Sequence, residues 1–355
     1  MSKIKAIDFF CGAGGLTRGL LNAGIKVLAG VDNDERLKET YTYNNKPSRF
    51  INKDIDAIDI HELRKELGIQ NEDTTLYAAC TPCQPFSTLN RQNLEDDDRK
   101  ILLLTFAEIV KECPPDFILV ENVPGLNNGC GKEVYDEFLE ILAECEFSDP
   151  AADLLDAKHF GVPQTRKRFI LLASKQGSIS LPIPQTDPDQ FVTVKKCIKK
   201  YPKIVDGKES KNYPNHIARK LQPHHKRIVE AVPENGGSRQ DVADTSILLK
   251  CHQEKPNAHR DVFGRMAWDK PAPTLTSRCV DVYSGRFTHP EHDRGISLRE
   301  AAALQTFEDD YKFFGTSISG IARQIGNAVP VKLAEHLGES IINSFQQEKG
   351  VHDES

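Results

Sequence analysis

The sequence predicts an α/β fold in which a doubly wound, mostly parallel sheet is joined to a second, smaller domain. Short apolar runs alternate with helical patterns through the first 175 residues, and glycines or acidic residues recur directly after these runs. After Ser174 the sequence becomes rich in proline and loses this alternation. Parallel strands of such a fold end along one edge of the sheet, and we expect the ligand site there.

Six apolar runs are expected to form strands, because each has the length of a strand and is bounded by turn residues. Between them, Ile101–Lys111 and Lys132–Glu144 carry apolar residues at the spacing of amphipathic helices. The resulting βα units are typical of a parallel sheet that has helices on both faces. The expected strands are Ile4–Phe9, Val27–Asp32, Phe50–Asp54, Leu76–Cys80, Phe117–Glu121 and Phe169–Ser174.

The rest of the chain divides where its composition changes. LPIPQTDPDQF opens a basic stretch broken by proline and glycine, which we interpret as a domain of its own. Ser297 and Glu300 form a capping-box pattern, and Pro330 suits the first turn of a final helix from Val331 to about Phe345. We expect a catalytic and cofactor-binding domain at 1–184, a second domain at 185–295, a return to the first at 296–345, and a frayed polar tail at 346–355.

Composition excludes several classes of protein. No run of about 18 apolar residues and no signal-peptide pattern is present, so we expect a protein of the cytoplasm without a membrane partner. Nine scattered cysteines do not make a disulfide framework. The net charge of −6 argues against a generally basic protein, yet residues 195–227 hold 11 Lys or Arg against 2 acidic residues.

The first expected turn, DFFCGAGG, has glycines that allow the backbone to pass close to a ligand. Alone it could be a plain tight turn, and Thr17 stands where a dinucleotide fingerprint needs its third glycine. Asp32 and Asp54 end the next two strands, where a carboxylate typically holds ribose hydroxyls, although either could be a helix cap. Together these features favour a nucleoside-bearing cofactor without a pyrophosphate, and S-adenosylmethionine fits that description.

CTPCQPFS follows the fourth expected strand and allows three interpretations. Pro82 and Pro85 disfavour the immediate helix that a redox pair needs, and no second cysteine pair is spaced for zinc, so we expect no metal. The third interpretation is a single nucleophilic thiol, which needs partners on neighbouring strand ends. FILVENVPG and GVPQTRKRFILLAS supply acidic and basic candidates there.

Taken together, the motifs resemble those of the DNA (cytosine-5) methyltransferases of bacterial restriction-modification systems. The resemblance spans nearly the whole chain, in the order DFFCGAGG, VDND, KDI, PCQPFS, DDRK, ENV, QTRKR, REAAALQTF and GNAVP. It implies a methyltransferase sheet of the Rossmann-like kind and a target-recognition domain at residues 185–295.

The resemblance also implies how S-adenosylmethionine is bound. Phe10 would pack on the adenine, Asp32 would hold the ribose, and Asp54 would bind the adenine amino group. Relatives often carry an aromatic residue after the ribose acid, where this chain has Asn33. The residues expected to bind the cofactor are Phe10, Gly12, Gly14, Asp32, Asp54, Ile55, Asn327 and Val329.

Catalytic roles follow from the same resemblance. Cys83 would attack carbon 6 of cytosine, and Glu121 would act as the general acid at ring nitrogen 3 and at the exocyclic amine. Arg168 would hold the base oxygen, and Arg166 would orient Glu121. Cys80 matches no catalytic position of the family, and we expect it to be a buried structural thiol.

A cytosine inside a duplex is stacked on both faces, so the base has to be rotated out of the helix before it can react. We expect the loop 86–99 to close over one groove, and the basic stretch 195–227 to contact phosphates. Expected partners are double-stranded DNA and a paired restriction endonuclease, with the enzyme acting as a monomer. The residues expected to contact DNA are Gln84, Ser87, Arg99, Thr274 and Arg278.

Two other functions are compatible with parts of the pattern. A branch of the same fold methylates cytosine in tRNA, but the large basic domain and the GNAVP ending favour DNA. A catalytically silent DNA-binding regulator is the second alternative, and the intact Cys83, Glu121 and Arg168 argue against it.

Overall fold

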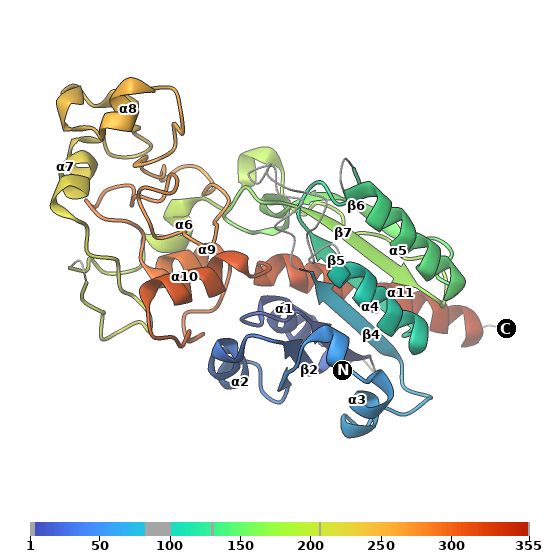
Figure 1. Ribbon diagram of the computed structural model, residues 1–355. Coiled ribbons are helices and arrows are strands. Elements are labelled where there is room, and N and C mark those ends of the chain that lie inside the picture. Colours follow the sequence, from blue (N-terminus) through green and yellow to red (C-terminus); the bar gives the residue numbers. More distant parts are fainter. Residues whose placement is uncertain (1–3, 82–100, 129–130, 206, 354–355) are drawn as a thin grey trace. The chain divides into compact units, whose positions relative to one another are not determined.

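The computed structural model describes residues 4–81, 101–128, 131–205 and 207–353, which belong to two compact units (Figure 1). The first unit comprises Met1–Asp156, Lys167–Pro184 and Val329–Ser355, and the second comprises Ala157–Arg166 and Gln185–Ala328. Residues 296–328, which the sequence analysis grouped with the first domain, therefore pack within the second unit. Among the described residues, no helix combines the length and the apolar character needed to cross a membrane.

A seven-stranded sheet with the order β3-β2-β1-β4-β5-β7-β6 forms the centre of the first unit. The five strands from β3 to β5 in this order pair in parallel, whereas β7 pairs antiparallel with both β5 and β6. The prediction of a doubly wound, mostly parallel sheet is therefore confirmed. The strands are β1 Lys5–Phe9, β2 Lys26–Asp32, β3 Arg49–Asn52, β4 Thr75–Cys80, β5 Phe117–Asn122, β6 Ala151–Asp156 and β7 Lys167–Ser174.

Strand β6 is the one the sequence analysis missed. Its sequence AADLLD contains alanine and aspartate, which are uncommon in strands, and three of its six residues are exposed. The segment becomes a strand because β7 offers it a complete antiparallel partner, from Ala151 opposite Leu172 to Asp156 opposite Lys167. Tertiary pairing therefore outweighs a weak local preference.

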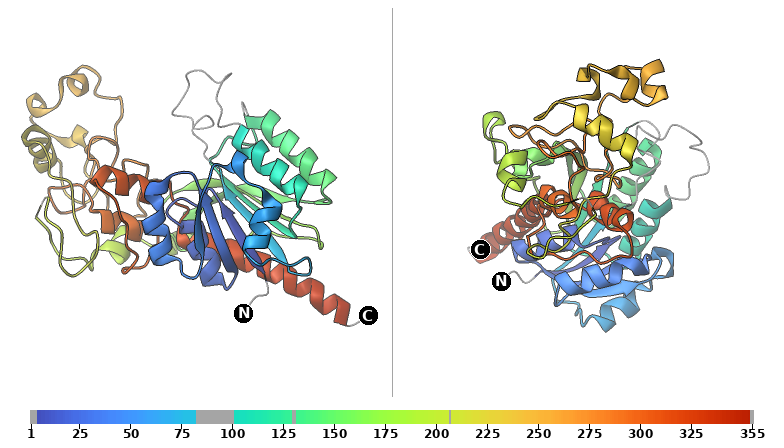
Figure 2. Two further views of the ribbon diagram at one scale, coloured as in Figure 1. Left: turned by 60° about the horizontal axis from the view of Figure 1, so that its bottom comes forward. Right: turned by 90° about the vertical axis from the view of Figure 1, so that its left-hand side faces the viewer.

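Helices cover both faces of the sheet (Figures 1 and 2). On one face, apolar residues of the strands form a core with α3 Ile60–Glu66, α4 Ile101–Glu112 and α5 Lys132–Glu144. On the other face, α1 Gly15–Ala23 packs against α11 Val331–Asp353. A side chain at Gly19 would lie 2.3 Å from the Cβ of Ala334, so this close helix contact requires glycine.

The ends of the predicted helices agree closely with the structure except at the C-terminus. Helix α5 has the bounds that were expected, and α11 begins at Val331. The prediction of a frayed tail after Phe345 was wrong, because α11 continues to Asp353. The sequence QQEK that follows Phe345 consists of residues with good intrinsic helix propensity, which explains the continuation.

The second unit contains little regular structure, and buried arginines hold its loops together. Its helices are α6 Val194–Ile198, α7 Pro223–Ala231, α8 Lys250–Glu254, α9 Leu298–Leu304 and α10 Ile318–Asn327. Arg265 donates hydrogen bonds to the carbonyl oxygens of Val229, Val232, His289 and His292. Arg299, 0 % exposed, likewise donates to Pro214, Glu308 and Tyr311, so guanidinium groups satisfy carbonyls that no strand or helix would satisfy here.

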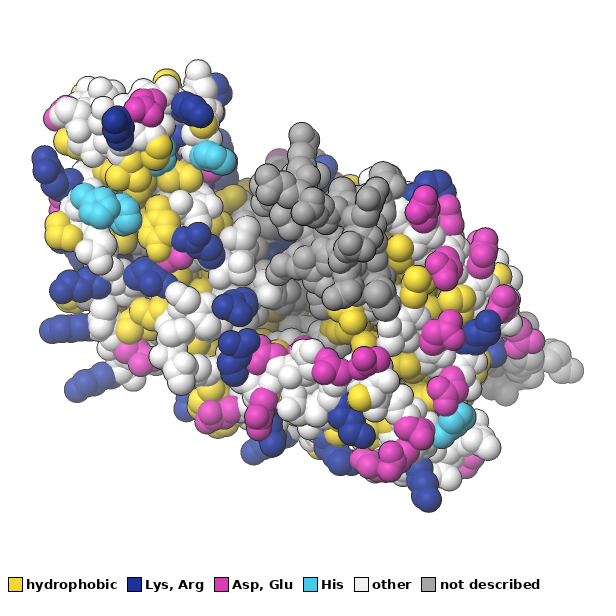
Figure 3. All heavy atoms as spheres, in the orientation of Figure 1, with side chains coloured by type: hydrophobic (Ala, Val, Ile, Leu, Met, Phe, Trp, Pro, Cys, Tyr) yellow, Lys and Arg dark blue, Asp and Glu magenta, His cyan; other side chains and the backbone are white. Residues whose placement is uncertain are grey.

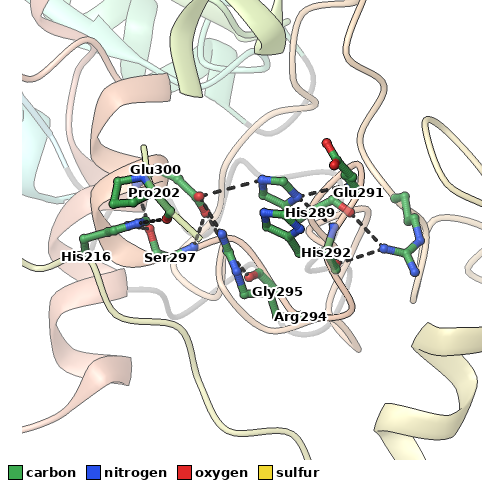
Figure 4. Close-up of polar contacts among 10 residues, drawn as sticks. Pro202, His216, His289, Glu291, His292, Arg294, Gly295, Ser297 and Glu300 are labelled. Carbon is green, nitrogen blue, oxygen red and sulfur yellow. Dashed lines mark hydrogen bonds and ion pairs between the residues drawn. The ribbon is translucent and has the colours of Figure 1, made fainter. Parts of the chain in front are cut away.

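An ion pair lies inside this unit where the predicted capping box begins α9 (Figure 4). Arg294 donates to both carboxylate oxygens of Glu300, at 2.7 and 2.8 Å, and the backbone N–H of Ser297 donates to the same carboxylate at 2.7 Å. Burial alone would raise the pKa of Glu300, but Arg294, with smaller contributions from His289 and the N–H of Ser297, lowers the pKa to about 2. The capping box of Ser297 and Glu300 is therefore confirmed and forms part of a buried charged cluster.

Candidate active site

The turn between β1 and α1 lies at the carboxyl edge of the sheet and is shaped for close approach. Phe10, Gly12 and Gly14 adopt positive φ angles of 58°, 55° and 88°. A side chain built at Gly12 would meet no atom within 4 Å, so the backbone of this turn borders open space. A ligand can therefore reach the peptide groups of the turn directly.

Asp32, at the end of β2, is fixed beside this turn. Its two carboxylate oxygens accept hydrogen bonds from the backbone N–H groups of Gly12 and Asp34, each at 3.0 Å. Burial raises the pKa of Asp32, while these two N–H groups oppose the rise. The carboxylate thus has a set orientation and keeps further acceptor positions for a ligand.

The next strand end adds a second carboxylate. Asp54 follows β3 and accepts a hydrogen bond from the side-chain amide of Asn33. Ile55 is 6 % exposed in the core cluster against which Phe10 packs. Asn33, which stands where relatives often carry an aromatic residue, therefore orients Asp54 in this chain.

These features fit the nucleoside part of S-adenosylmethionine. Two carboxylates supply acceptors for ribose hydroxyls and for an amino group, and Phe10 and Ile55 supply apolar surface for a ring. Thr17, at the position of the missing third glycine, donates instead to buried Asp8 at 2.5 Å and lies 3.0 Å from the hydroxyl of Tyr41. Burial raises the pKa of Asp8 to about 7. The first turn of α1 is therefore hydrogen-bonded to buried polar side chains of the protein.

A second cluster lies at the ends of β4, β5 and β7. Oε1 of Glu121 lies 2.9 Å from Nε of Arg168, and Oε2 accepts a hydrogen bond from the thiol of Cys80 at 2.8 Å. Glu121 is 3 % exposed. A buried carboxylate held on both oxygens can act in proton transfer or hydrogen bonding to a base with a fixed geometry.

The sequence analysis expected Glu121 and Arg168 in one site but gave Arg166 as the residue that orients Glu121, whereas the structure pairs Glu121 with Arg168. It also took Cys80 for a buried structural thiol. The thiol is half-buried and touches the carboxylate. The register of β4 against β5 would have predicted this contact, because Cys80 and Glu121 are direct partners across the parallel pair. Beyond them, Asn122 donates to the hydroxyl of Thr81 at 2.7 Å.

Part of the predicted site falls on residues that the structure does not describe. Cys83, Gln84, Ser87, Arg99 and the loop 86–99 lie outside the described residues. Their roles stay predictions.

Arg166 is 2 % exposed within the second unit and donates to the carbonyls of Leu275, Gly326 and Ala328. Its role toward Glu121 stays a prediction. The two GNAVP residues expected at the cofactor belong to different units, Asn327 as the exposed end of α10 and Val329 as a buried residue of the first unit.

The predicted DNA contacts of the second unit can be placed. Thr274 donates its hydroxyl hydrogen to the carbonyl of Thr165 at 2.6 Å. Arg278 is exposed, lies over the ring of Tyr283 at 5.1 Å and donates to Asp281 at 3.3 Å. An arginine held by an aromatic ring and a carboxylate presents its remaining donors in a restricted orientation.

The basic stretch of the second unit is exposed as well (Figure 3). Arg219 is the exception, because it is half-buried and pairs with Asp281 at 2.7 Å. Exposed cations at this density can contact a polyanion such as a phosphate backbone. The exposed basic residues between positions 195 and 227 are Lys195, Lys196, Lys199, Lys200, Lys203, Lys208, Lys211, Lys220, Lys226 and Arg227.

Comparisons with known proteins identify the family of the chain. The profile of the C-5 cytosine-specific DNA methylase family matches residues 4–343. The Type II methylase M.HgiDII of Herpetosiphon aurantiacus is 38 % identical over 352 residues, which cover 98 % of this chain and 96 % of that protein. The Type II methyltransferase M1.HphI of Haemophilus parahaemolyticus is 30 % identical over 95 % of this chain and 86 % of its own length.

Solved structures show the same fold. A DNA modification methyltransferase encoded within an E. coli prophage superimposes with a TM-score of 0.70 at 24 % identity, covering 97 % of this chain and 99 % of that one. The S. pombe Dnmt2 methyltransferase gives a TM-score of 0.60 at 16 % identity, covering 96 % and 98 %. With the family profile matched over residues 4–343, the chain belongs to the C-5 cytosine-specific DNA methylase family.

Proposed function

We propose that the chain transfers a methyl group from S-adenosylmethionine to carbon 5 of a cytosine rotated out of duplex DNA, through a transient bond to Cys83. Methylation of DNA cytosine at carbon 5 follows from its family. The observation that carries the mechanistic part is the buried carboxylate of Glu121, whose Oε1 lies 2.9 Å from Nε of Arg168 where β5 ends and β7 begins.

The chemistry requires a base that is activated before it is attacked. Carbon 6 of cytosine is a poor electrophile until ring nitrogen 3 gains a proton or a strong hydrogen bond. Glu121 would donate that hydrogen bond, because its carboxyl group is buried and is held by Cys80 and Arg168. Arg168, paired with Glu121, would hold the base oxygen with its remaining N–H donors.

Cys83 would then form a covalent bond with carbon 6. The electron pair of the ring double bond moves toward carbon 5, which becomes nucleophilic enough to take a methyl group. Loss of the hydrogen at carbon 5 and departure of the Cys83 thiolate restore the aromatic ring. Attack and departure both depend on the same carboxyl group changing its hydrogen bond to ring nitrogen 3.

S-adenosylmethionine would supply the electrophilic methyl group when it is bound. Asp32, oriented by the N–H groups of Gly12 and Asp34, would accept hydrogen bonds from the ribose hydroxyls. Asp54, oriented by Asn33, would accept from the adenine amino group. Phe10 and Ile55 would exclude water from the ring faces.

The second unit would bind the duplex. Its exposed basic residues would contact phosphates, which set affinity and salt dependence but carry no sequence information. Arg278, exposed and held over Tyr283, would reach a base edge. A paired restriction endonuclease would recognise the same sequence.

The test is transfer of labelled methyl groups to duplex DNA and to tRNA, followed by bisulfite sequencing of host DNA after expression. We expect incorporation into duplex DNA alone and 5-methylcytosine at one recurring sequence. Transfer to tRNA but not to DNA would contradict the proposal, and so would DNA binding without any methyl transfer.

A further inference from the structure

Three strand ends converge on one carboxyl group in the candidate active site. Strand β5 lies between β4 and β7 in the sheet, so Glu121 at its end has a neighbour on each side. Cys80 from β4 reaches Oε2 at 2.8 Å, and Arg168 from β7 reaches Oε1 at 2.9 Å. Among the described residues, the titratable or charged side chains with contacts to this carboxyl are therefore one thiol and one guanidinium.

The geometry of the pair β4 and β5 explains why the thiol arrives there. Cys80 and Glu121 are register partners in a parallel ladder, so their side chains leave the sheet on the same face. The next pair repeats the arrangement, with Asn122 donating to Thr81 at 2.7 Å and both residues buried. Asn122 also accepts a hydrogen bond from the N–H of Val123 at 2.8 Å, which restricts its rotation. Two consecutive side-chain contacts thus fix the ends of β4 and β5.

We propose that Cys80 is a positioning residue for Glu121, donating its S–H to Oε2 so that Arg168 and the thiol together fix the plane of the carboxyl group. This inference rests on the proposed function of Glu121. A carboxylate offers about four acceptor positions, so a thiol and a guanidinium leave others free for the base. Neither donor needs to leave for the cytosine to bind.

A hydrogen bond needs a donor at position 80, whereas packing needs only a side chain of similar size. Loss of the donor should let the carboxyl group of Glu121 turn out of the plane that the base requires, and so lower the maximal rate.

The experiment compares Cys80→Ala, Cys80→Ser and Cys113→Ala in the full chain. Serine keeps a donor, alanine removes it, and Cys113 is a half-buried thiol of the same unit that serves as the control. For Cys80→Ala we expect kcat to fall about tenfold, with KM for DNA and for S-adenosylmethionine within about twofold of the wild-type values. Cys80→Ser should restore most of the lost kcat, and Cys113→Ala should match the wild type.

A spectroscopic readout separates the hydrogen bond from catalysis. The S–H stretching band of Cys80 is assigned by its absence from Cys80→Ala. In Glu121→Gln this band should move to higher frequency, because a neutral amide is a weaker hydrogen-bond acceptor than a carboxylate. A wild-type kcat in Cys80→Ala, or a band that Glu121→Gln does not move, would overturn the inference while leaving the methyltransferase proposal intact. An inactive wild-type enzyme would instead refute the proposed function itself.

Discussion

Replacing Glu300 by glutamine should destabilise the protein strongly, because it leaves the buried guanidinium of Arg294 without its counter-charge. The two side chains are 1 % and 2 % exposed and share two hydrogen bonds of 2.7 and 2.8 Å. Removing one partner of such a pair costs about 3–5 kcal/mol. The pKa of Glu300, lowered from 4.5 to about 2, corresponds to a similar figure of about 3 kcal/mol, at about 1.4 kcal/mol per pH unit.

The assay is unfolding in urea, monitored by tryptophan fluorescence. The chain has a single tryptophan, Trp268, whose ring lies 5.2 Å from that of His289 beside the pair. The control is Glu230→Gln, which breaks the exposed pair with Lys226 at 4.0 Å and should cost less than about 1 kcal/mol. If Glu300→Gln lowered the free energy of unfolding no more than this control, the argument from buried charge would be refuted.

Three further predictions concern His289, the cofactor site and the basic stretch of the second unit. Nδ1 of His289 accepts hydrogen bonds from the backbone N–H groups of Glu291 and His292, and burial lowers the pKa of His289 from 6.5 to about 3. Its contribution to stability is therefore complete above pH 6.5 and is lost as the pH falls toward 3. In His289→Gln the free energy of unfolding should depend less on pH between about pH 5 and 6.5 than it does in the wild type. Asp32→Ala should weaken S-adenosylmethionine binding about 10- to 100-fold in calorimetry, and unchanged affinity would contradict the cofactor site. Lys195→Ala combined with Lys196→Ala should reduce the slope of log affinity for DNA against log salt by about 2, and an unchanged slope would mean that these lysines face water.

The sequence predicted the sheet well because each strand in the parallel part carries its own apolar run between turns. It did not predict β6, since AADLLD has no strand pattern and depends on β7 for its pairing. For the second unit, the sequence predicted a separate domain with irregular structure but not how its loops are held together. Its structure depends on buried arginines such as Arg265, whose carbonyl partners are distant in sequence and follow no local pattern.

In the candidate site, too, some features follow from the sequence and others depend on contacts in the folded chain. Glu121 and Arg168 could be assigned from motifs, and strand ends place them at one edge of the sheet. The contact of Cys80 with Glu121 requires the register of β4 against β5, which a single sequence does not specify. The pairing of Asn33 with Asp54 likewise joins two loops and appears only in the folded chain.

The central claim is that one thiol, Cys83, bonds to a cytosine that Glu121 and Arg168 activate. Trapping on duplex DNA that carries 5-fluorocytosine in the target sequence tests it most directly, because fluorine at carbon 5 prevents release of the enzyme after methyl transfer. We predict a covalent complex that survives denaturing electrophoresis with the wild type and with Cys80→Ser, and none with Cys83→Ser. A complex of equal yield in Cys83→Ser, or none with an actively methylating wild type, would contradict the account.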